Sequence, residues 1–348
     1  MWPKRRLLLA AGADRTVRGR YGKTALTYPI RNGHIAMVQW LLSLGFDPNE
    51  VSESGWTALF EAASAGDADC VRMLLDAGAD VHFTSIGSSA IGSASTLAVV
   101  RVLVGAGAVL DDLNREMRMA MTRLPLDGKL TCSPEHYRSA KHRIFGTTNP
   151  ERMNFPFWKA MVACGGGGYR AKSHFAPEEK LTEAVWCYDR YGKSITELPD
   201  GRIIEIGGEH EDYYDPDFCI YNDVVVHRGD GTFDIYGYPE AVFPPTDFHS
   251  ATLVGDSIYI IGRLGYQGQR QFGTTPVYRL DIHTLAIETV ETSGELPGWI
   301  YRHRAKVVER GIEVWGGELS TWVGDEERYE DNTNIHVLNP ITGLWSRP

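Results

Sequence analysis

Cysteine is scarce in this chain of 348 residues, and the cysteines that it has do not form pairs. The five stand far apart, with no Cys-x-x-Cys pattern among them: Cys70, Cys132, Cys164, Cys187 and Cys219. An odd and scattered set argues against a disulfide framework and against a structural zinc site. Such a set is typical of a reducing compartment, so we expect a cytoplasmic protein.

Long apolar runs and signatures of catalysis are also missing. No apolar run reaches the roughly 18 residues of a membrane-spanning helix, so we expect no membrane partner. There is no Gly-x-Ser-x-Gly elbow, no His-Glu-x-x-His motif and no kinase signature. Four glycines at 165–168 lack the Gly-Lys-Ser/Thr of a phosphate loop, and we interpret them as a hinge. The sequence therefore indicates no catalytic residue and no cofactor.

Lysine and arginine are outnumbered by acidic residues in only one half of the chain. Residues 1–150 hold 17 Lys and Arg against 14 Asp and Glu, a net charge of +3. Residues 151–348 hold 18 against 31, a net charge of −13. The acidic half would repel a phosphate backbone, so we do not expect nucleic acid as a partner.

What the sequence does contain is a repeat of 33 residues. The endings "LLLAAGAD", "WLLSLGFDPN" and "MLLDAGADVH" place Leu8, Leu41 and Leu74 33 residues apart. The beginnings "YGKTALT" and "SGWTALF" recur at the same interval, and each unit predicts a short helix followed by a second, amphipathic one. We interpret the opening of the chain as the second helix of a repeat without its first half. A short secretory signal is the alternative.

This pattern, with its Gly-x-Thr-x-Leu and Gly-Ala-Asp, resembles the ankyrin repeat. The resemblance implies a helical solenoid over residues 1–110, with a half repeat, two complete repeats and an eroded third that is about four residues short. Pro29 predicts a kinked or shortened first helix. We also expect partners to bind the loop tips, through Arg20, Tyr21, Lys23, Glu53 and Trp56. Trp56 should be exposed there; the alternative is that it packs on the neighbouring turn.

Residues 111–190 predict a helical cap and linker. "DDLNREMRMAMTRL" has helical periodicity and would cap the solenoid. Ser133 and Pro134 are typical of a helix N-terminus. "NPERMNFPFWKAMVAC" predicts a further helix that ends at the four glycines.

From residue 191 the periodicity becomes that of strands. Three stretches each predict a strand, a tight turn and a second strand, and another strand pair follows each of them. The turns are Asp200-Gly201, Gly255-Asp256 and Arg310-Gly311. Four short strands in a period of roughly 50 residues predict the blades of a propeller.

The glycine doublets of these blades resemble those of kelch repeats. Gly207-Gly208 and Gly316-Gly317 are intact, whereas the middle doublet is Gly262-Arg263, and Trp345 holds the kelch tryptophan position once. The whole chain resembles bacterial proteins that join ankyrin repeats to kelch-like blades. The predicted fold class is therefore multidomain α plus all-β: an ankyrin-like helical solenoid, then about three kelch-like blades over residues 191–348 that form a partial propeller.

Loop length predicts the binding face of this second architecture. In a propeller the loops between strands two and three share one face with the loops between blades, and here both are long. These loops carry aromatic residues that we expect to bind a partner protein: Tyr213, Tyr214, Trp299 and Trp322. They also carry polar residues that we expect to hold any small ligand: Glu209, His210, Asp215, His249, His303 and Glu318.

Alternatives remain open for this polar set. The acidic stretch after Gly208 offers oxygen ligands for calcium, but it lacks EF-hand spacing, and we favour a solvated loop without metal. His249 and His303 hold the same place in successive blades and would point toward the propeller axis, with Lys193 in that place in the first blade. They are either acid–base groups or, as we favour, hydrogen-bonded structural residues.

The predicted function is that of a scaffold that binds another protein. The alternative is a metal- or carbohydrate-acting enzyme with its site on the long-loop face. Three blades must also deal with unpaired edges. Residues 155–190, where "TEAVWCYDRYG" is strand-like, would complete the propeller, and we favour this route. Otherwise two chains form a homodimeric six-bladed ring, or helices from residues 111–170 cover the edges.

Overall fold

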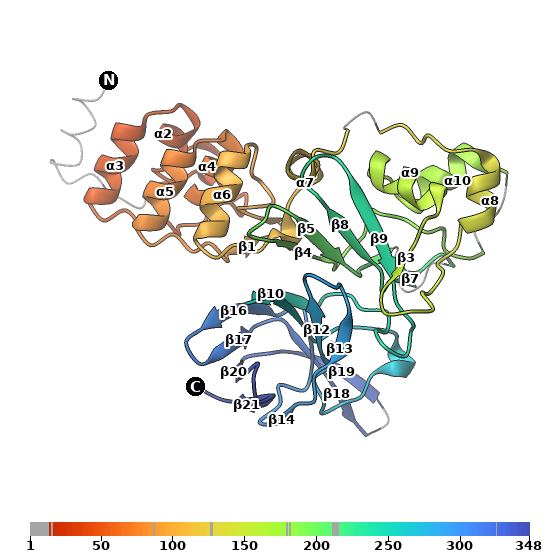
Figure 1. Cartoon of the computed structure of the whole chain (residues 1–348). Helices are drawn as coiled ribbons and strands as arrows, with labels where there is room; N and C mark the ends of the chain where they lie inside the picture. Colours follow the sequence, from red (N-terminus) through yellow and green to blue (C-terminus); the bar gives the residue numbers. More distant parts are fainter. Residues whose placement is uncertain are drawn as a thin grey trace. The chain divides into compact units, whose positions relative to one another are not determined.

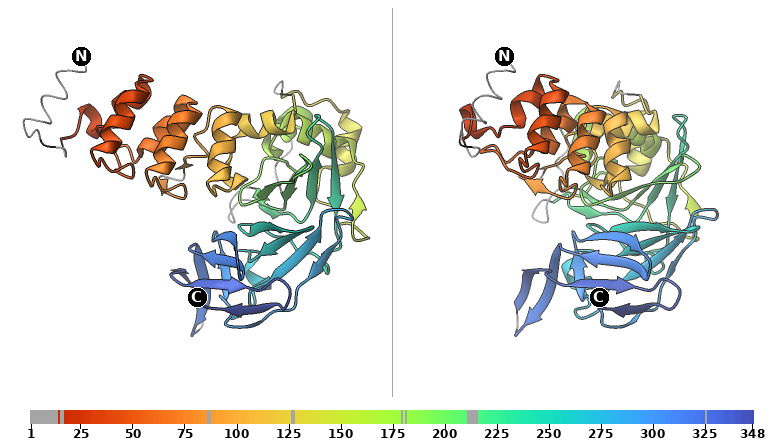
Figure 2. Two further views of the ribbon diagram at one scale, coloured as in Figure 1. Left: turned by 60° about the vertical axis from the view of Figure 1, so that its left-hand side comes forward. Right: turned by 90° about the vertical axis from the view of Figure 1, so that its left-hand side faces the viewer.

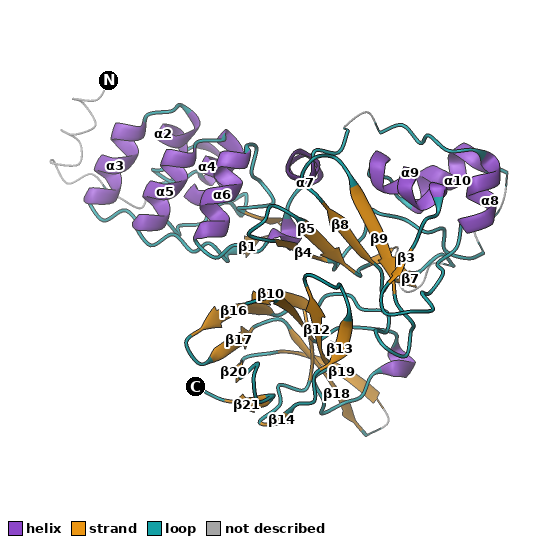
Figure 3. Cartoon of the chain, in the orientation of Figure 1, coloured by secondary structure: helices purple, strands orange, loops and turns teal. Residues whose placement is uncertain are grey.

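The computed structural model describes Asp14 and residues 17–85, 88–125, 128–178, 180, 182–210, 216–324 and 326–348. The chain divides into two compact units, Met1–Met121 and Thr122–Pro348 (Figure 1). Short helices build the first unit, and helices together with mainly antiparallel sheets build the second (Figure 3).

The first unit is a series of helix pairs. Its helices are α2 (Thr27–Arg31) and α3 (Ile35–Ser43), α4 (Ala58–Ala65) and α5 (Ala68–Asp76), then α6 (Leu97–Gly105) and α7 (Arg115–Thr122). Shorter elements join them: η1 (Arg20–Gly22), β1 (Thr84–Ser85), β2 (Ser88–Ser89) and η2 (Leu110–Asp112). Val38 and Leu41 of α3 are buried, as are Val71 and Leu74 of α5. The two predicted complete repeats are therefore confirmed as helix pairs with buried apolar stripes.

Glycine and side-chain caps set the helix boundaries. Gly66 ends α4 in the left-handed conformation (φ 76°), which a residue without a Cβ adopts most readily. The Asp67 carboxylate accepts a hydrogen bond of 2.9 Å from the Cys70 backbone N–H and so begins α5. Thr57 holds the N-cap position of α4, but its hydroxyl makes no capping hydrogen bond.

Two departures from the repeat pattern change the first helices. α2, which contains Pro29, has 5 residues where α4 has 8, so the predicted shortening is confirmed. In the third repeat, turns over residues 90–93 replace the first helix, which accounts for its missing residues. The Asn114 side-chain amide donates hydrogen bonds to the carbonyls of Gly92 and Ala94, so the start of α7 is tied to these turns.

The second unit begins with helices α8 (Pro134–Ala140), α9 (Pro156–Cys164) and α10 (Gly168–Phe175). The Ser133 hydroxyl accepts a hydrogen bond of 3.3 Å from the His136 backbone N–H, with Pro134 in the first turn, as predicted. Gly165 ends α9 in the left-handed conformation (φ 61°), at the predicted helix end.

The segment that we expected to complete the propeller does not do so. Residues 156–175 are mostly helical, and a single bridge from Tyr191 to Glu209 is the β-pairing of the described part of "TEAVWCYDRYG". No closed ring of sheets is found among the described residues. The favoured prediction of a fourth blade from residues 155–190 is therefore wrong. The apolar side chains of this segment pack in a helical layer and a buried loop instead.

Three antiparallel meanders of four strands follow one another along the chain. The first sheet holds β4 (Ser194–Glu197), β5 (Ile203–Ile206), β8 (Val224–His227) and β9 (Phe233–Gly237). The second sheet holds β10 (Ser250–Val254), β11 (Ser257–Ile261), β12 (Val277–Asp281) and β13 (Ile287–Thr289). The third sheet holds β16 (Arg304–Val308), β17 (Gly311–Trp315), β20 (Ile335–Leu338) and β21 (Leu344–Ser346). These pairs confirm the predicted strands and the turns at Asp200-Gly201 and Gly255-Asp256. The third turn lies one residue earlier than predicted, at Glu309-Arg310, because Gly311 already pairs with Val308.

Shorter strands extend the three sheets or lie in their long loops. β3 (Glu151–Arg152) pairs with β9, and β14 (Ser293–Gly294) pairs in parallel with β21. The loop of the first sheet contains β6 (Glu209–His210) and β7 (Cys219–Ile220), and that of the second contains η3 (Gln267–Gln269). β15 (Trp299–Tyr301), β18 (Glu318–Val323) and β19 (Glu326–Asp331) form a separate three-stranded sheet.

The three sheets are stacked face to face, with β4, β10 and β16 as neighbours (Figure 1). The alternation of β11 shows how the cores form. Ile258 and Ile260 belong to a core shared with the first sheet, whereas Tyr259 and Ile261 belong to a core shared with the third. This alternation is what a strand buried on both faces requires.

The chain turns just before the first strand of each sheet, and the residue two positions before that strand has the same backbone conformation in all three sheets. We call these three residues the corners. Gly192, Phe248 and Arg302 have positive φ angles of 60°, 48° and 55°. The Phe248 backbone N–H donates to the Gly192 carbonyl, and the Arg302 backbone N–H donates to the Phe248 carbonyl, each at 2.7 Å. Main-chain hydrogen bonds therefore join the sheets from corner to corner. They help to hold Phe248 and Arg302 in a conformation that large residues rarely adopt.

In each of the three sheets a glycine directly follows the second strand. Two of these glycines lie close to main-chain carbonyl oxygens of the segment that leads into the next sheet. A Cβ at Gly207 would stand 2.1 Å from the Thr246 carbonyl oxygen, and a Cβ at Gly262 would stand 2.4 Å from that of Ile300. Gly316 holds the same place in the third sheet, but a Cβ there would meet no atom within 4 Å. All three have positive φ angles, of 60°, 67° and 64°.

The outer face of the third sheet differs from the corresponding faces of the other two. Here Arg304, Lys306 and Glu313 stand where the other sheets have a serine, a threonine and an apolar residue. The replaced residues are Ser194, Thr196 and Ile204 in the first sheet and Ser250, Thr252 and Tyr259 in the second. Lys306 and Glu313 form an ion pair of 2.7 Å, and the Lys306 ammonium lies 5.0 Å from the centre of the Trp315 ring. A further sheet would have to desolvate these charges.

Alanine substitutions test the stacking. Gly207→Ala and Gly262→Ala should each lower the free energy of unfolding by more than about 3 kcal/mol, because the main chain of the next sheet must move. Gly316→Ala should cost only about 1–2 kcal/mol, because it adds backbone strain without a clash. Chemical denaturation of the three variants measures this difference, and equal losses in all three would contradict the stacking.

Candidate functional site

Exposed aromatic side chains of the first unit gather on its first repeat. Tyr21 of η1 and Tyr28 of α2 are 67 % and 50 % exposed. The guanidinium carbon of Arg20 lies 4.9 Å from the centre of the Tyr21 ring. Tyr21 itself has φ 65° and ψ 33°, an uncommon conformation for a large residue. We call Arg20, Tyr21 and Tyr28 the first-repeat patch.

Ion pairs hold this part of the chain in place. Arg18 pairs with Glu50 at 3.0 Å and donates a hydrogen bond to the Val51 carbonyl. Arg31 of α2 pairs with the buried Glu61 of α4 at 2.6 Å. Both pairs join neighbouring repeats, so the first-repeat patch is supported by the solenoid and is not carried on an isolated loop.

The other predicted loop-tip residues are less accessible than Tyr21. Glu53 is exposed and packs against Gly22, where a Cβ would stand 2.1 Å from its side chain. Lys23 is half-buried. Trp56 is also half-buried, and its ring lies 6.0 Å from that of Phe60. The expectation of an exposed Trp56 is therefore wrong, because the indole packs within its own repeat.

The aromatic residues predicted on the long-loop face divide into two kinds. Trp299 is 2 % exposed, and its indole N–H donates a hydrogen bond of 3.0 Å to the Leu264 carbonyl. It therefore presents no side chain to a partner. Trp322 is 53 % exposed and lies 5.5 Å from the Phe272 ring. Tyr213, Tyr214 and Asp215 lie outside the described residues.

The described residues of the predicted ligand set have separate local contacts. The His210 ring is buried beside the start of α10, where a Cβ at Gly168 would stand 3.3 Å from its Nε2. Glu318 accepts a hydrogen bond of 2.6 Å from the Tyr301 hydroxyl and pairs with Arg302 at 2.9 Å. These contacts are made within the protein itself.

His249 and His303 link successive sheets. His249 Nε2 and Ser194 Oγ share a hydrogen bond of 2.7 Å, and His303 Nε2 and Ser250 Oγ share one of 2.9 Å. Both histidines are buried. Burial lowers the pKa of each to about 3, helped in His249 by the nearby His303. They are neutral at physiological pH and occupied with inter-sheet bonds, which favours the structural interpretation over acid–base catalysis.

Asp247 directly precedes Phe248 and is a buried carboxylate. The strand repeat does not indicate it as a functional residue. Burial raises its pKa to about 6, although a hydrogen bond from the Gly265 backbone N–H and the charge of Arg263 act against this rise. That hydrogen bond is 2.7 Å long. Glu209 interacts with the same carboxylate. Asp247 therefore titrates in the range where a carboxyl group can exchange a proton near neutral pH.

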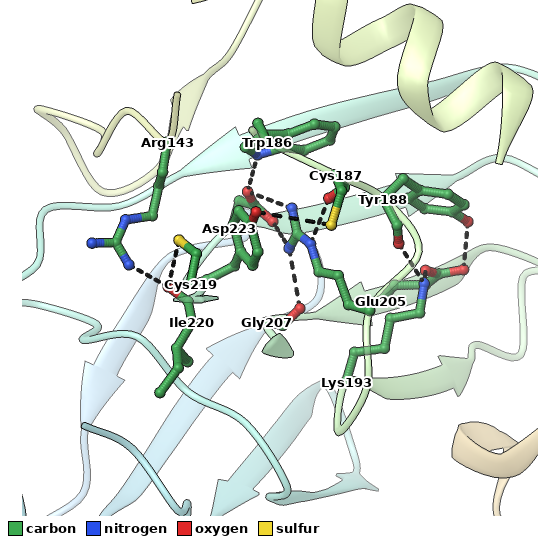
Figure 4. A network of polar contacts seen from close by, with 12 residues as sticks. Arg143, Trp186, Cys187, Tyr188, Lys193, Glu205, Gly207, Cys219, Ile220 and Asp223 are labelled. Atoms are coloured by element: carbon green, nitrogen blue, oxygen red, sulfur yellow. Dashed lines mark hydrogen bonds and ion pairs between the residues drawn. The ribbon is translucent and has the colours of Figure 1, made fainter. Parts of the chain in front are cut away.

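A second buried network surrounds Arg190. Its guanidinium carbon lies 3.6 Å from the centre of the Tyr221 ring and 4.9 Å from that of Trp186. It forms an ion pair of 2.5 Å with Asp223, which also accepts a hydrogen bond of 2.8 Å from the Trp186 indole N–H (Figure 4). Burial opposes the charge of Arg190, but Asp223 more than offsets this and raises its pKa. The arrangement satisfies a buried charge and leaves no group available for chemistry.

The same network covers the outer face of the first sheet. Glu205 stands there in the place that Ile260 holds in the second sheet, and it pairs with the buried Lys193 (Figure 4). The Tyr188 hydroxyl donates a hydrogen bond of 2.7 Å to Glu205 and lies 3.2 Å from His227 Nε2. Tyr188 thus occupies the face on which a preceding sheet would have to pack.

The thiols offer little reactivity. Cys187 and Cys219 are buried, and burial raises the pKa of Cys187 to about 12. Such thiols stay protonated at neutral pH and are poor nucleophiles. Within the described ranges, no group of three or more His, Cys, Asp or Glu is placed to hold a metal ion. In the same ranges, no helix has the length and apolar character needed to cross a membrane.

Comparison with known proteins concerns the first unit. Residues 5–85 match the family described as Ankyrin repeats (3 copies). The N-terminal region therefore contains ankyrin repeats. The match begins within the opening segment that we predicted to be a half repeat; the structure of residues 1–13 lies outside the described residues.

The curated relatives each match a short stretch of this chain. Cortactin-binding protein 2 of Oryctolagus cuniculus is 40 % identical over 76 residues, which are 22 % of this chain and 4 % of that protein. The 2-5A-dependent ribonuclease of Mus musculus is 41 % identical over 74 residues, which are 21 % of this chain and 10 % of that protein. Probable E3 ubiquitin-protein ligase XBOS33 of Oryza sativa subsp. japonica is 46 % identical over 70 residues, which are 20 % and 14 %. The chain thus spans a small part of each.

The two buried histidines predict how stability depends on pH. Their folded pKa of about 3 lies below the ordinary 6.5, so the unfolded chain binds more protons between these values. Stability should be full above pH 6.5 and fall below it by about 1.4 kcal/mol per pH unit for each histidine. Asp247 opposes this below about pH 6, because its folded pKa is raised. Denaturant unfolding at pH 7, 6 and 5 measures the slope.

A matched variant isolates the histidine contribution. His249→Gln with His303→Gln keeps hydrogen-bonding groups near both serines but cannot titrate. Its stability should fall less steeply than that of the wild type between pH 7 and 5. Parallel slopes in the two proteins would show that these histidines do not have lowered pKa values.

A second prediction concerns the buried ion pair between Arg190 and Asp223. Asp223→Leu should cost about 3–5 kcal/mol of unfolding free energy, because it leaves a buried guanidinium without its carboxylate. The double variant Arg190→Met with Asp223→Leu should recover much of that loss. Chemical denaturation of both variants tests this, and a double variant that loses as much as the single one would refute the account of a charge stabilised by its partner.

Proposed function

We propose that this chain is a binding protein that recognises another protein through the loop-tip side of its ankyrin repeats. The observation that carries the proposal is the first-repeat patch, in which Tyr21 and Tyr28 are exposed and Arg20 stacks on Tyr21. Tyrosine and arginine are enriched among the residues that contribute most to protein interfaces, and tyrosine buries a large area with few rotatable bonds. The presence of ankyrin repeats supports the same role.

We further propose that the second unit is a kelch-like partial propeller that acts with the repeats as a scaffold. Three consecutive four-stranded meanders, with glycines at matching places, support this interpretation. Its long-loop face would provide a second surface through Trp322. A cytoplasmic location fits five cysteines without a disulfide.

Binding is favoured over the enzymatic alternative. An enzyme would need several of its candidate polar groups to face a substrate together. His249 and His303 are instead buried and bonded to serines, and Glu318 is bonded to Tyr301 and Arg302.

The first-repeat patch can be tested by removing its rings. Tyr21→Ala with Tyr28→Ala should reduce the recovery of bound proteins from a cell extract by about tenfold or more, because exposed tyrosine anchors contribute about 1–2 kcal/mol each. Quantitative pull-down with the whole chain as bait measures the loss. Thermal unfolding should change little, because both side chains are exposed.

Tyr169→Ala is the matched control. Tyr169 is 63 % exposed and lies on α10, outside the repeats, so its loss should leave recovery unchanged. If the control reduces recovery as much as the double variant, or if the double variant binds normally, the patch is not the binding surface.

A further inference from the structure

A hairpin in the second unit carries an open sheet edge. Strands β18 and β19 pair over their full lengths, with Ser320 opposite Tyr329 and Trp322 opposite Glu327. β15 lies on the other side of β18, so β19 is the edge of this three-stranded sheet. Figure 2 shows the hairpin, in blue, reaching away from the three meanders. We call residues 318–324 and 326–331 the edge hairpin.

Buried polar contacts fix the edge hairpin at its centre. Glu327 of β19 forms an ion pair of 2.5 Å with Arg270, and both side chains are at most 5 % exposed. The Gln267 side-chain amide donates a further hydrogen bond of 3.0 Å to Glu327. The Phe272 ring packs against Trp322. The edge hairpin is therefore a supported element, and its open edge is held in a fixed position.

The backbone of β19 is available on one side. No strand of the described chain pairs with it there, and most of its residues are exposed. An unpaired strand edge presents a row of N–H and C=O groups, to which a further strand can add. The side chains beside this edge decide which strand that would be.

Those side chains are aromatic and acidic. Trp322 and Tyr329 are 53 % and 51 % exposed. The edge hairpin holds five acidic residues and one basic residue, a net charge of −4. Two of the five, Glu318 and Glu327, are neutralised by Arg302 and Arg270. The other three are exposed on β19: Glu326, Glu330 and Asp331.

Charge excludes some occupants of this edge. A second copy of β19 would bring its own acidic residues against these, and like charges across a strand pair are destabilising. An acidic segment is excluded for the same reason. Glu326 and Glu330 share one face of β19 with Arg328, whereas Asp331 shares the other face with Trp322 and Tyr329. A segment rich in lysine or arginine would place positive charge beside the carboxylates of both faces, and its side chains on the second face would lie on the two rings.

We propose that the open edge of β19 binds an extended basic segment of another protein, which adds to the sheet as a fourth strand. Main-chain hydrogen bonds supply the pairing, and Glu326, Glu330 and Asp331 select for positive charge. This site is separate from the first-repeat patch, so its test does not depend on the function proposed for the repeats.

The probe is a synthetic ten-residue peptide of alternating lysine and valine, titrated into the whole chain by calorimetry at about 0.1 M salt. Glu326→Gln with Glu330→Gln should weaken binding by about fivefold or more, since exposed ion pairs contribute up to about 1 kcal/mol each. Glu240→Gln with Glu309→Gln removes the same charge from exposed positions elsewhere and should change affinity less than twofold. Tyr21→Ala with Tyr28→Ala should have no effect.

A second peptide separates strand addition from simple attraction between charges. Methylation of every backbone nitrogen keeps the lysines but removes the N–H donors from both edges of the peptide, so that neither edge can pair with β19. The methylated peptide should lose at least tenfold in affinity for the wild-type chain. Equal affinity for both peptides, equal weakening by the two glutamine pairs, or no binding of the unmodified peptide would each overturn the proposal.

Discussion

The close approach of one sheet's main chain to a glycine of the sheet before it is the constraint on which the second unit depends. Gly207 and Gly262 leave room for carbonyl oxygens that a Cβ would displace. This contact brings the corners at Gly192, Phe248 and Arg302 into hydrogen-bonding distance, and it places His249 and His303 against the serines of the preceding sheet. The apolar cores between the sheets follow from the same spacing.

The stack has two outer faces, one on the first sheet and one on the third. Each outer face has charged residues where the faces between sheets have apolar or uncharged ones. At the first sheet, Glu205 replaces an apolar residue and is neutralised by Lys193 beneath Tyr188. At the third sheet, Lys306 and Glu313 form an ion pair on the outer face. Repeat arrays generally need polar terminal faces to stay soluble. We infer that these substitutions end the stack, so that neither a fourth sheet nor a second chain completes it.

The elements that recur along the sequence could be predicted from it, whereas contacts made at a single position could not. Spacing located the helix pairs, the strands and the glycines, because each depends on local residue types that recur at a fixed interval. It did not predict the Arg190–Asp223 network, since the positions corresponding to Asp223 are Pro276 and Asn334. It also misjudged Trp56 and Trp299, because the burial of one aromatic residue depends on contacts such as that with Phe60, which no periodicity encodes.

From the ankyrin repeats and the charged ends of the stack, we propose that this protein binds other proteins and does not assemble with itself. Light scattering across a dilution series tests this most directly, with the wild type compared with Arg304→Ser, Lys306→Thr and Glu313→Ile combined, which gives the third sheet residues found in the first. The wild type should remain a single 38.7 kDa species at every concentration, whereas the triple variant should self-associate as its concentration rises. A wild-type species of twice that mass at micromolar concentration would contradict the account.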